Sequence, residues 1–442
     1  MSLHRFRAVA CPLGWTPNGG TQLCDPPVGI DPNKNNKSCA AGCNGTDPIN
    51  SATGALLQTE TDYAGDGGLL RLARYYTSVN GQYNQNRLGL QWRTNFDAYI
   101  GLVTSGSGSV TTATVYRPDG DRFNFVENAQ GQWVPDADVA LTLTSTTDSG
   151  GNILSWTLID EEGTKEGYNA NGFLVSIVRK DQKQLTLAYS ELNLATVIDE
   201  HGRSLNFTYG TVTWNGSQTD TRLLIVTEPD GSSINYGYDS STGLLTTVTY
   251  KDASGSNPQT RTYVYGENGA PFQAMTGLID ENLHRYASWA YDSKGRAKLS
   301  VHGTTSDYVD RTELTYNTDG TTTITNWIDG DAGVSFTRNF SFDVLYGVAH
   351  LAIVGCNGCT SAAIQLPGQI PLPAAASYDS NGFPAAEIDW RGNATAHTYD
   401  TTGLETQRIE AQGTSVQRTT NTQWDACCAI RWIARCWMPT TP

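Results

Sequence analysis

Charged residues are scarce in this chain of 442 residues, and basic ones are scarcest. The chain has 29 Lys and Arg against 44 Asp and Glu, so its formal net charge is −15 at pH 7. It holds no basic cluster that could neutralise a row of phosphates, and nucleic acid is therefore excluded as an expected partner. Apolar runs are also short. None approaches the ~20 residues that a membrane-spanning helix needs, so no membrane span is expected.

The motifs of common catalytic and cofactor sites are missing as well. The chain has no G-x-S-x-G, no phosphate-binding loop and no dinucleotide fingerprint after a strand. The six histidines form neither an HExxH motif nor a paired cluster: His4, His201, His284, His302, His350 and His397. Carboxylates recur regularly in turn sequences, which explains them without acid–base chemistry. We therefore predict that the protein is not an enzyme and that it uses no cofactor and no metal.

Cysteine is absent from a long central stretch and concentrated at the ends of the chain. Four cysteines lie in a leader rich in Pro, Gly and Asn, and they predict two disulfides with three connectivities open: Cys11, Cys24, Cys39 and Cys43. Such a leader indicates an oxidising compartment, so we expect a secreted or cell-envelope protein, although the N-terminus has no recognisable signal peptide. Cys356 and Cys359 form one CxxC. A local disulfide or a pair of free thiols is favoured for this motif. Half of a zinc site is disfavoured because no second close pair of cysteines follows at zinc-finger spacing, and a redox pair is disfavoured as well.

What the chain does have is the composition of a β protein rich in turns. It contains 45 Gly, 21 Tyr, 11 Trp and only 3 Met. Aromatic residues and Thr suit half-buried strands, and Gly supplies the positive φ that tight turns need. Asp119-Gly120, between "TATVYRP" and "DRFNFV", predicts a β-hairpin. Sustained heptads and long amphipathic helical runs are missing. We predict an all-β fold.

A degenerate unit of about twenty residues recurs from about residue 160 onward. Each unit reads as a turn, a strand, a second turn of D-x-x-G type and another strand, as in Ile388–Leu404, "IDWRGNATAHTYDTTGL". In the second turn a Gly takes the left-handed conformation and an Asp accepts hydrogen bonds from turn amides. The marker positions are Tyr238, Asp239 and Gly243; Tyr291, Asp292, Gly295 and Arg296; Tyr378, Asp379 and Gly382; and Tyr399, Asp400 and Gly403. One such hairpin is marginal alone, but many in series share a buried face. The pattern therefore predicts repeated antiparallel β-hairpins in one spiralling sheet.

These units resemble the YD repeat of Rhs proteins, a group that includes bacterial polymorphic toxins. A second match precedes them, "DPINSATGALLQTETDYAG…LLRLARYYTS…VYRPDG", which is similar to the region before the repeats in bacterial Rhs proteins. We accordingly divide the chain into four parts: a Cys-rich leader that is mostly loop over 1–46, an N-terminal Rhs-associated β region over 47–160, a YD-repeat array over 161–424, and an atypical Cys/Trp-rich tail over 425–442.

The resemblance implies a β-strand spiral wrapped into a hollow shell that holds a C-terminal toxic domain. The expected partners are that cargo domain and the remainder of the shell, with secretion machinery or cell-surface glycans as further candidates. The D-P-x-G-L cleavage motif expected after the repeats is missing, and the tail departs from the repeat texture. Truncation or a frameshift is the favoured explanation, and a short member with a Cys-rich cap is the alternative. A cell-surface adhesion protein that binds carbohydrate is the alternative function. We also expect 1–442 alone to be poorly soluble or oligomeric, because a repeat array cut short exposes an edge.

Overall fold

The predicted all-β class is confirmed by a computed structural model of the chain. The structure describes residues 16–18, 23–25, 30–34, 49–65, 69–79, 87–104, 110–160, 162–327, 332–333, 335–357, 373–400 and 403–424. These residues form strands β1 to β32 and one 3-10 turn, η1 (Glu267–Gly269), without an α-helix among them. Within the described ranges, no helix has the length and apolar character to cross a membrane.

Two small sheets come first in the chain. β1 (Thr16–Asn18) pairs with β2 (Leu23–Asp25). A three-stranded antiparallel sheet, called the inner sheet below, follows after an isolated bridge between Ile49 and Leu56. Its strands are β3 (Leu57–Ala64), β4 (Arg71–Thr77) and β5 (Trp92–Thr94).

All later strands belong to one sheet, called the curved sheet below, in which consecutive strands pair antiparallel. Its first half consists of β6 (Tyr99–Thr104), β7 (Val110–Tyr116), β8 (Arg122–Glu127), β9 (Trp133–Pro135), β10 (Thr142–Thr147), β11 (Ile153–Ile159), β12 (Lys165–Asn169), β13 (Leu174–Val178), β14 (Gln184–Ser190), β15 (Asn193–Asp199), β16 (Ser204–Trp214), β17 (Gln218–Thr227), β18 (Ser233–Tyr238) and β19 (Leu245–Lys251). Its second half consists of β20 (Gln259–Tyr265), β21 (Met275–Ile279), β22 (Arg285–Tyr291), β23 (Ala297–His302), β24 (Val309–Tyr316), β25 (Thr322–Trp327), β26 (Ser335–Leu345), β27 (Val348–Asn357), β28 (Ala375–Tyr378), β29 (Pro384–Ile388), β30 (Ala394–Tyr399), β31 (Glu405–Glu410) and β32 (Arg418–Asn421).

Local sequence explains why each hairpin forms. The predicted hairpin at Asp119-Gly120 is confirmed, since β7 and β8 pair on either side of it and Gly120 has a φ of +100°. Within strands, exposed and buried residues alternate: β14 reads exposed, buried, exposed, buried from Gln184 onward. In such a strand the period of two directs one face to the core and the other to water.

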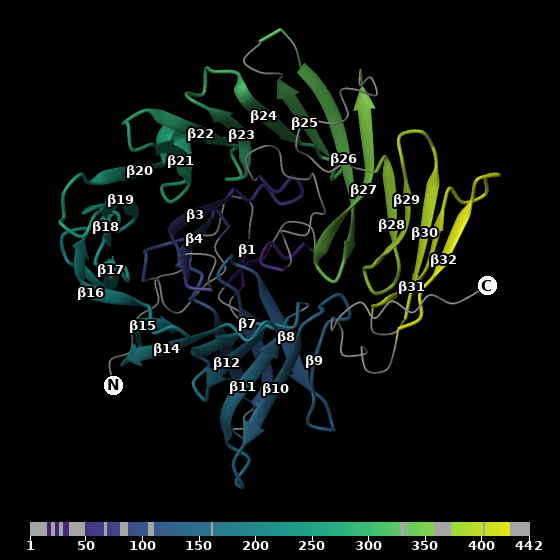
Figure 1. Ribbon diagram of the computed structural model, residues 1–442. Coiled ribbons are helices and arrows are strands. Elements are labelled where there is room, and N and C mark those ends of the chain that lie inside the picture. The colour runs from purple at the N-terminus through teal and green to yellow at the C-terminus, as the bar shows by residue number, and fades with distance from the viewer. Residues whose placement is uncertain are drawn as a thin grey trace.

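The curved sheet bends around the inner sheet. Figure 1 shows its strands running in an arc from β7 through β18 and β24 to β32, with β3 and β4 inside the arc. Contacts across this space are specific: the Thr322 hydroxyl donates to the Ser51 carbonyl at 2.7 Å, and the Ala297 amide donates to the Gly54 carbonyl at 2.8 Å. The face of the curved sheet that carries these contacts is therefore its inner face.

Two contacts bring distant parts of the sheet together. An isolated bridge joins Tyr99 of β6 to Phe173, next to β13. The second contact is made by residues 30–34, called the strap below. The Asp31 amide donates to the Gly347 carbonyl in the β26–β27 turn at 2.7 Å, and the Asn33 carbonyl accepts from the Arg122 amide of β8 at 2.6 Å. The strap thus links β8 to a turn more than two hundred residues later.

The strap ends in an ion cluster in which Lys34 and Asp138 are buried and Asp136 is exposed. Lys34 is 6 % exposed, and its ammonium group lies 2.6 Å from Asp136, 3.0 Å from Asp138 and 2.8 Å from the Tyr346 carbonyl oxygen. Asp136 and Asp138 follow β9, whereas Tyr346 lies in the β26–β27 turn. One cation therefore joins two turns that are far apart in the sequence.

The domain boundary placed at residue 160 lies between β11 and β12, which pair with one another along five register positions.

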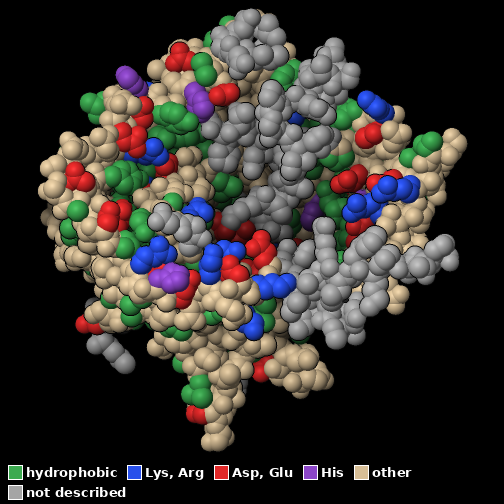
Figure 2. Space-filling view, viewed as in Figure 1, with side chains coloured by type: hydrophobic (Ala, Val, Ile, Leu, Met, Phe, Trp, Pro, Cys, Tyr) green, Lys and Arg blue, Asp and Glu red, His purple; other side chains and the backbone are tan. Residues whose placement is uncertain are grey.

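Most residues of the predicted leader, 1–46, lie outside the described residues. All residues of the predicted tail, 425–442, lie outside them. On the face shown in Figure 2, side chains of both charge signs are intermingled over the described surface.

Candidate functional site at the contact between the two sheets

The tyrosine of the repeat unit joins neighbouring strands. In six places a Tyr at or near the end of one strand donates its hydroxyl to a backbone carbonyl of the strand before it. The pairs are Tyr189 to Leu174 (2.9 Å), Tyr238 to Leu223 (2.6 Å), Tyr265 to Leu245 (2.7 Å), Tyr291 to Met275 (2.8 Å), Tyr316 to Ala297 (2.5 Å) and Tyr378 to Leu351 (3.0 Å). Tyr399 packs its ring 5.2 Å from that of Phe383. Burial raises the pKa of Tyr378 and of Tyr399 to about 12.

A β-bulge comes directly before many of these tyrosines. The pairing with the next strand shifts register between each of the following residue pairs: Gly167/Tyr168, Ala188/Tyr189, Thr208/Tyr209, Gly237/Tyr238, Val264/Tyr265, Ala290/Tyr291, Ser377/Tyr378 and Thr398/Tyr399. A bulge bends its strand and increases the local twist. Repeated at the same point of successive hairpins, it gives the sheet its curvature.

The aspartate and glycine that follow the tyrosine form the turn. Asp292 accepts hydrogen bonds from the backbone amides of Lys294 and Arg296, both at 2.9 Å, and Asp379 accepts from Asn381 and Phe383 in the same way. Asp400 accepts from Leu404. The four glycines have positive φ: Gly243 (+71°), Gly295 (+78°), Gly382 (+83°) and Gly403 (+83°).

The Asp239 turn is one residue longer than the others. The Gly243 amide donates to the Asp239 carbonyl four residues back, whereas Gly295 donates to Asp292 three residues back. Hydrogen bonds from the hydroxyls of Ser241 and Thr242 lower the pKa of Asp239 to about 2. Arg296 has a further contact, because its guanidinium lies 4.0 Å from the ring centroid of Tyr316.

The most concentrated chemistry lies where the inner sheet meets the curved sheet. Asp62 and Arg74 form a two-point ion pair, with Nε at 2.5 Å from one carboxylate oxygen and Nη2 at 2.8 Å from the other, and both side chains are fully buried. Asp62 is the extra residue of a bulge in β3, since the register shifts between Thr61 and Tyr63. Asp62 lies on the same buried face of β3 as Glu60, which also contacts the curved sheet.

Three tyrosines from consecutive strands of the curved sheet complete this cluster. Tyr236 of β18 and Tyr250 of β19 donate to the Asp62 carboxylate at 2.9 Å and 2.7 Å. Tyr263 of β20 accepts from Arg74 Nη2 at 2.9 Å. Asp62, Arg74, Tyr236, Tyr250 and Tyr263 are called the Asp62 cluster below. The Asp62 carboxylate thus accepts four hydrogen bonds, which offset part of the free-energy cost of burying it.

Electrostatics within the cluster favour its charged pair. Burial disfavours the charged guanidinium, but the Asp62 carboxylate outweighs this effect and holds the pKa of Arg74 well above its ordinary value. Burial, and next the negative charge of Asp62, raise the pKa of Tyr236 well above its ordinary value. The cluster therefore binds the two sheets together, and of the Arg74 nitrogens only Nη1 has no hydrogen-bond partner in it.

Neighbouring contacts extend this attachment in both directions. Glu60, also on β3, forms an ion pair with Arg261 of β20. The Tyr76 ring of β4 lies 5.4 Å from Trp92, whose indole N–H donates to the Tyr265 hydroxyl at 2.9 Å. The interface is thus a mixture of ion pairs, aromatic contacts and hydrogen bonds.

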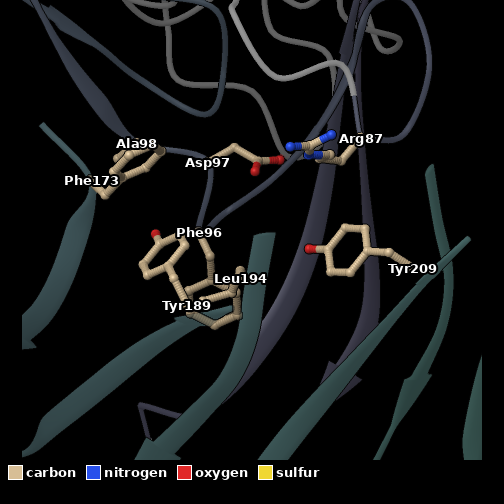
Figure 3. A pocket seen from close by; sticks show the side chains of 8 residues that line it. All are labelled: Arg87, Phe96, Asp97, Ala98, Phe173, Tyr189, Leu194 and Tyr209. Carbon is tan, nitrogen blue, oxygen red and sulfur yellow. The ribbon is translucent and has the colours of Figure 1, made fainter. Parts of the chain in front are cut away.

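A small pocket lies beside the segment that follows β5 (Figure 3). It is lined by Arg87, Phe96, Asp97, Ala98, Phe173, Tyr189, Leu194 and Tyr209. Asp97 points toward Arg87 in this view, and its carboxylate accepts from the Thr94 amide at 2.6 Å. Burial raises the pKa of Asp97, but the Tyr189 hydroxyl nearby is already bonded to a backbone carbonyl. Burial, and next the negative charge of Asp97, raise the pKa of Tyr189 and of Tyr209 above their ordinary values.

The cysteine predictions stay open. Cys11, Cys39, Cys43 and Cys359 lie outside the described residues, and for Cys24 and Cys356 only the backbone is described. Three or more metal-binding side chains do not come together anywhere in the described part of the chain.

Sequence reasoning missed the members of the Asp62 cluster. It used "TETDYAG" and "LLRLARYYTS" only as family markers. A signal was present, because Glu60 and Asp62 are two residues apart in a strand and so share a face, which makes two carboxylates on one side of a sheet. The three tyrosines of the Asp62 cluster could not be predicted, because no local feature of the sequence indicates which strands of the repeat array face β3.

One family model matches part of the chain. Residues 46–125 match the model of a domain of unknown function, DUF6531, which covers the inner sheet and the start of the curved sheet. No curated protein is detectably similar in sequence.

Three of the solved structures with some likeness are of TcdB2-TccC3 and of a Tc holotoxin pore. TcdB2-TccC3 without its hypervariable C-terminal region shares 10% identity with a TM-score of 0.33, over 80% of this chain and 22% of that one. TcdB2-TccC3 shares 9% identity with a TM-score of 0.27, over 90% and 24%. The Photorhabdus luminescens Tc holotoxin pore shares 13% identity with a TM-score of 0.29, over 84% and 19%. The chain spans less than a quarter of the length of each of these three structures. Scores this low assign no function, which has to come from the contacts within the chain.

Proposed function

We propose that this chain is the first part of a β-shell of the Rhs type, a non-catalytic scaffold that encloses a polypeptide cargo. Its partners are the remainder of the shell and a toxic domain that would follow it. Delivery of such a cargo to another cell requires export, so a secreted or envelope location belongs to the same proposal.

One observation carries the proposal: the curved sheet holds a segment of polypeptide on its inner face. The inner sheet comes from residues 57–94, yet its contacts reach Tyr236, Tyr250 and Tyr263, all more than 150 positions later. Three consecutive strands direct polar side chains inward to a buried ion pair. A sheet that wraps one polypeptide segment in this way has the curvature and the inward polar groups that are needed to wrap another.

The sugar-binding alternative has less support from the repeat tyrosines. Binding of sugars by aromatic stacking requires exposed rings, but Tyr291 is 8 % exposed and the other three marker tyrosines are half-buried. The hydroxyls of Tyr238, Tyr291 and Tyr378 already bind the preceding strand. Their arrangement favours packing within the sheet.

The test begins with the DNA that follows this coding sequence. We expect further Tyr-Asp units, in the same or a shifted frame, that lead to a D-P-x-G-L motif and a variable domain. The chain joined to that continuation should protect the variable domain from trypsin, whereas the domain expressed alone should be digested. An unrelated downstream gene, or a domain digested equally fast in both forms, would refute the proposal.

A further inference from the structure

The pocket of Figure 3 contains polar groups that the described residues leave without full hydrogen bonding. The Arg87 guanidinium makes one long contact, from Nη1 to the Thr221 carbonyl oxygen at 3.5 Å, and its Nε is buried without a hydrogen-bond partner. The Tyr209 hydroxyl points into the pocket and forms no hydrogen bond with the described part of the chain. Polar groups in such surroundings are normally satisfied, so these two indicate a missing partner.

Backbone contacts hold the charged residues of the pocket in place. The Arg87 carbonyl accepts hydrogen bonds from the Leu223 amide at 2.8 Å and from the Tyr238 hydroxyl at 3.2 Å. The Asp97 carboxylate accepts from the Thr94 amide at 2.6 Å, and the Asp97 amide donates to the Thr94 carbonyl at 3.1 Å. The pocket is therefore formed by the fold itself, and a ligand would not have to order these residues when it binds.

The charges of the pocket select against an ionic ligand. Arg87 and Asp97, which are both described, face one another without forming an ion pair (Figure 3). An anion in the space between them would be repelled by the Asp97 carboxylate, and a cation would be repelled by the guanidinium. A neutral group with an acceptor on one side and a donor on the other satisfies both residues. The buried side chains of Phe96 and Leu194 supply an apolar surface beside these polar groups.

We propose that this pocket binds the neutral carboxamide end of a small molecule. The amide oxygen accepts hydrogen bonds from Arg87 and Tyr209, and the amide nitrogen donates to Asp97. Phe96 and Leu194 contact the carbon next to the amide. Because the pocket is small, only the end of the ligand enters it. The site lies within the described part of the chain, so it depends neither on a cargo nor on the remainder of the shell.

The binding test uses the full chain and three ligands of one planar shape, namely neutral acetamide, anionic acetate and cationic acetamidinium. Saturation-transfer NMR follows the methyl signal of each ligand in a titration at pH 8, because burial raises the pKa of Asp97 and its carboxylate form is required. We expect acetamide to bind with a Kd on the order of 10 mM, since so small a ligand makes few contacts. Each ion should bind roughly tenfold more weakly, because it places one like charge beside its own.

Variants assign the binding to individual side chains. Arg87→Met should weaken acetamide binding about tenfold and Tyr209→Phe about threefold, because a charged and a neutral hydrogen-bond donor are lost. Asp97→Asn replaces the carboxylate with a group of equal shape that also donates, so this variant should prefer acetate to acetamide. A purely structural role of Asp97 would not reverse the preference. Arg408→Met and Tyr286→Phe, at exposed positions, are the matched controls and should bind acetamide as the parent chain does.

Four results would overturn the proposal. The first is acetate or acetamidinium binding to the parent chain as tightly as acetamide. The second is acetamide without saturable binding up to about 200 mM, which indicates a pocket that takes only water. The third is an unchanged acetamide affinity in Arg87→Met with the near-ultraviolet circular dichroism of the parent chain. The fourth is tighter binding of the blocked peptide Gly-Gly-Gln-Gly-Gly than of acetamide, which assigns the pocket to the side chain of a polypeptide instead of a small molecule.

Discussion

Tyr76 and Tyr291 bind the two sides of the same residue, Met275. The Met275 amide donates to the Tyr76 hydroxyl at 2.8 Å, and the Met275 carbonyl accepts from the Tyr291 hydroxyl at 2.8 Å. Tyr76 belongs to the inner sheet and Tyr291 is a marker of the repeat. The repeat tyrosine that fixes one strand to the next therefore also fixes the strand to which the inner sheet is attached.

The first prediction concerns that hydroxyl. Tyr291→Phe should destabilise the fold by about 1–3 kcal/mol, because the buried Met275 carbonyl loses a donor while the ring remains. Urea denaturation followed by tryptophan fluorescence measures the change. Tyr286→Phe is the control, since Tyr286 lies on the same strand and is 50 % exposed, and it should change the free energy of unfolding little. Equal effects of the two changes would refute a special role for the repeat tyrosine.

The second prediction concerns the buried ion pair. Arg74→Met should cost about 3–5 kcal/mol, because it leaves the Asp62 carboxylate buried without its cation. The double change Asp62→Leu with Arg74→Met should recover much of this loss, since two apolar groups then face one another. Arg408→Met, at an exposed pair, should cost at most about 1 kcal/mol. Thermal unfolding of the four proteins measures these differences, and a double variant no more stable than Arg74→Met would contradict the reasoning.

Sequence alone predicted the class of fold and the hairpins well. Asp119-Gly120 marks a hairpin because few other dipeptides fit its backbone, and the residues of β14 reveal their buried face by alternation. These are local properties, fixed within ten residues or so. Each follows from backbone geometry or from the period of two.

Long-range contacts could not be read in the same way. That Asp62 meets Tyr236 and Tyr250 depends on the curvature of the whole sheet, which accumulates from bulges spread over many hairpins. Those bulges are not evident from the residues before each tyrosine, which include Gly237, Ala290 and Thr398. Lys34 lies in a leader that reads as loop, so its buried position beside Asp138 had no local signal.

The third prediction compares two glycines with nearly equal backbone angles. Gly172 and Gly202 have φ of +82° and +80°, so each alanine variant carries a strain of about 1–2 kcal/mol. A Cβ at Gly172 would also lie 2.0 Å from the Ile100 carbonyl oxygen of β6, whereas one at Gly202 meets nothing within 4 Å. Gly172→Ala should therefore cost roughly 1–3 kcal/mol more than Gly202→Ala. Chemical denaturation of both variants decides the matter, and equal losses would mean that the β6 contact near Gly172 adds no stability.

The fourth prediction concerns pH. Burial, followed by the negative charges of Asp230 and Asp62, raises the pKa of Glu228 to about 7. The folded state then binds a proton more readily than the unfolded chain between about pH 4.5 and 7. The stability that Glu228 contributes is therefore fully present below this window and declines as pH rises through it. Glu228→Gln should make the unfolding midpoint less dependent on pH in this range, whereas Glu162→Gln, at an exposed turn, should not. A parent protein whose stability changes with pH at the same rate as that of Glu228→Gln would count against the raised pKa.

The fifth prediction concerns the strap. Lys34→Met removes the cation from Asp138, whose side chain is 4 % exposed, and from the Tyr346 carbonyl. We expect a loss of about 3–5 kcal/mol, as for a buried pair with one partner removed. Burial already raises the pKa of Asp138 against the pull of Lys34, so the carboxyl of the variant should take up a proton more easily. Hydrogen exchange should quicken at the β26–β27 turn and after β9, the two regions that Lys34 joins, while β14 to β16 stay protected. Lys180→Met, at an exposed turn, is the control. Uniform acceleration over the whole sheet would mean that Lys34 supports the fold in general and does not join these two turns in particular.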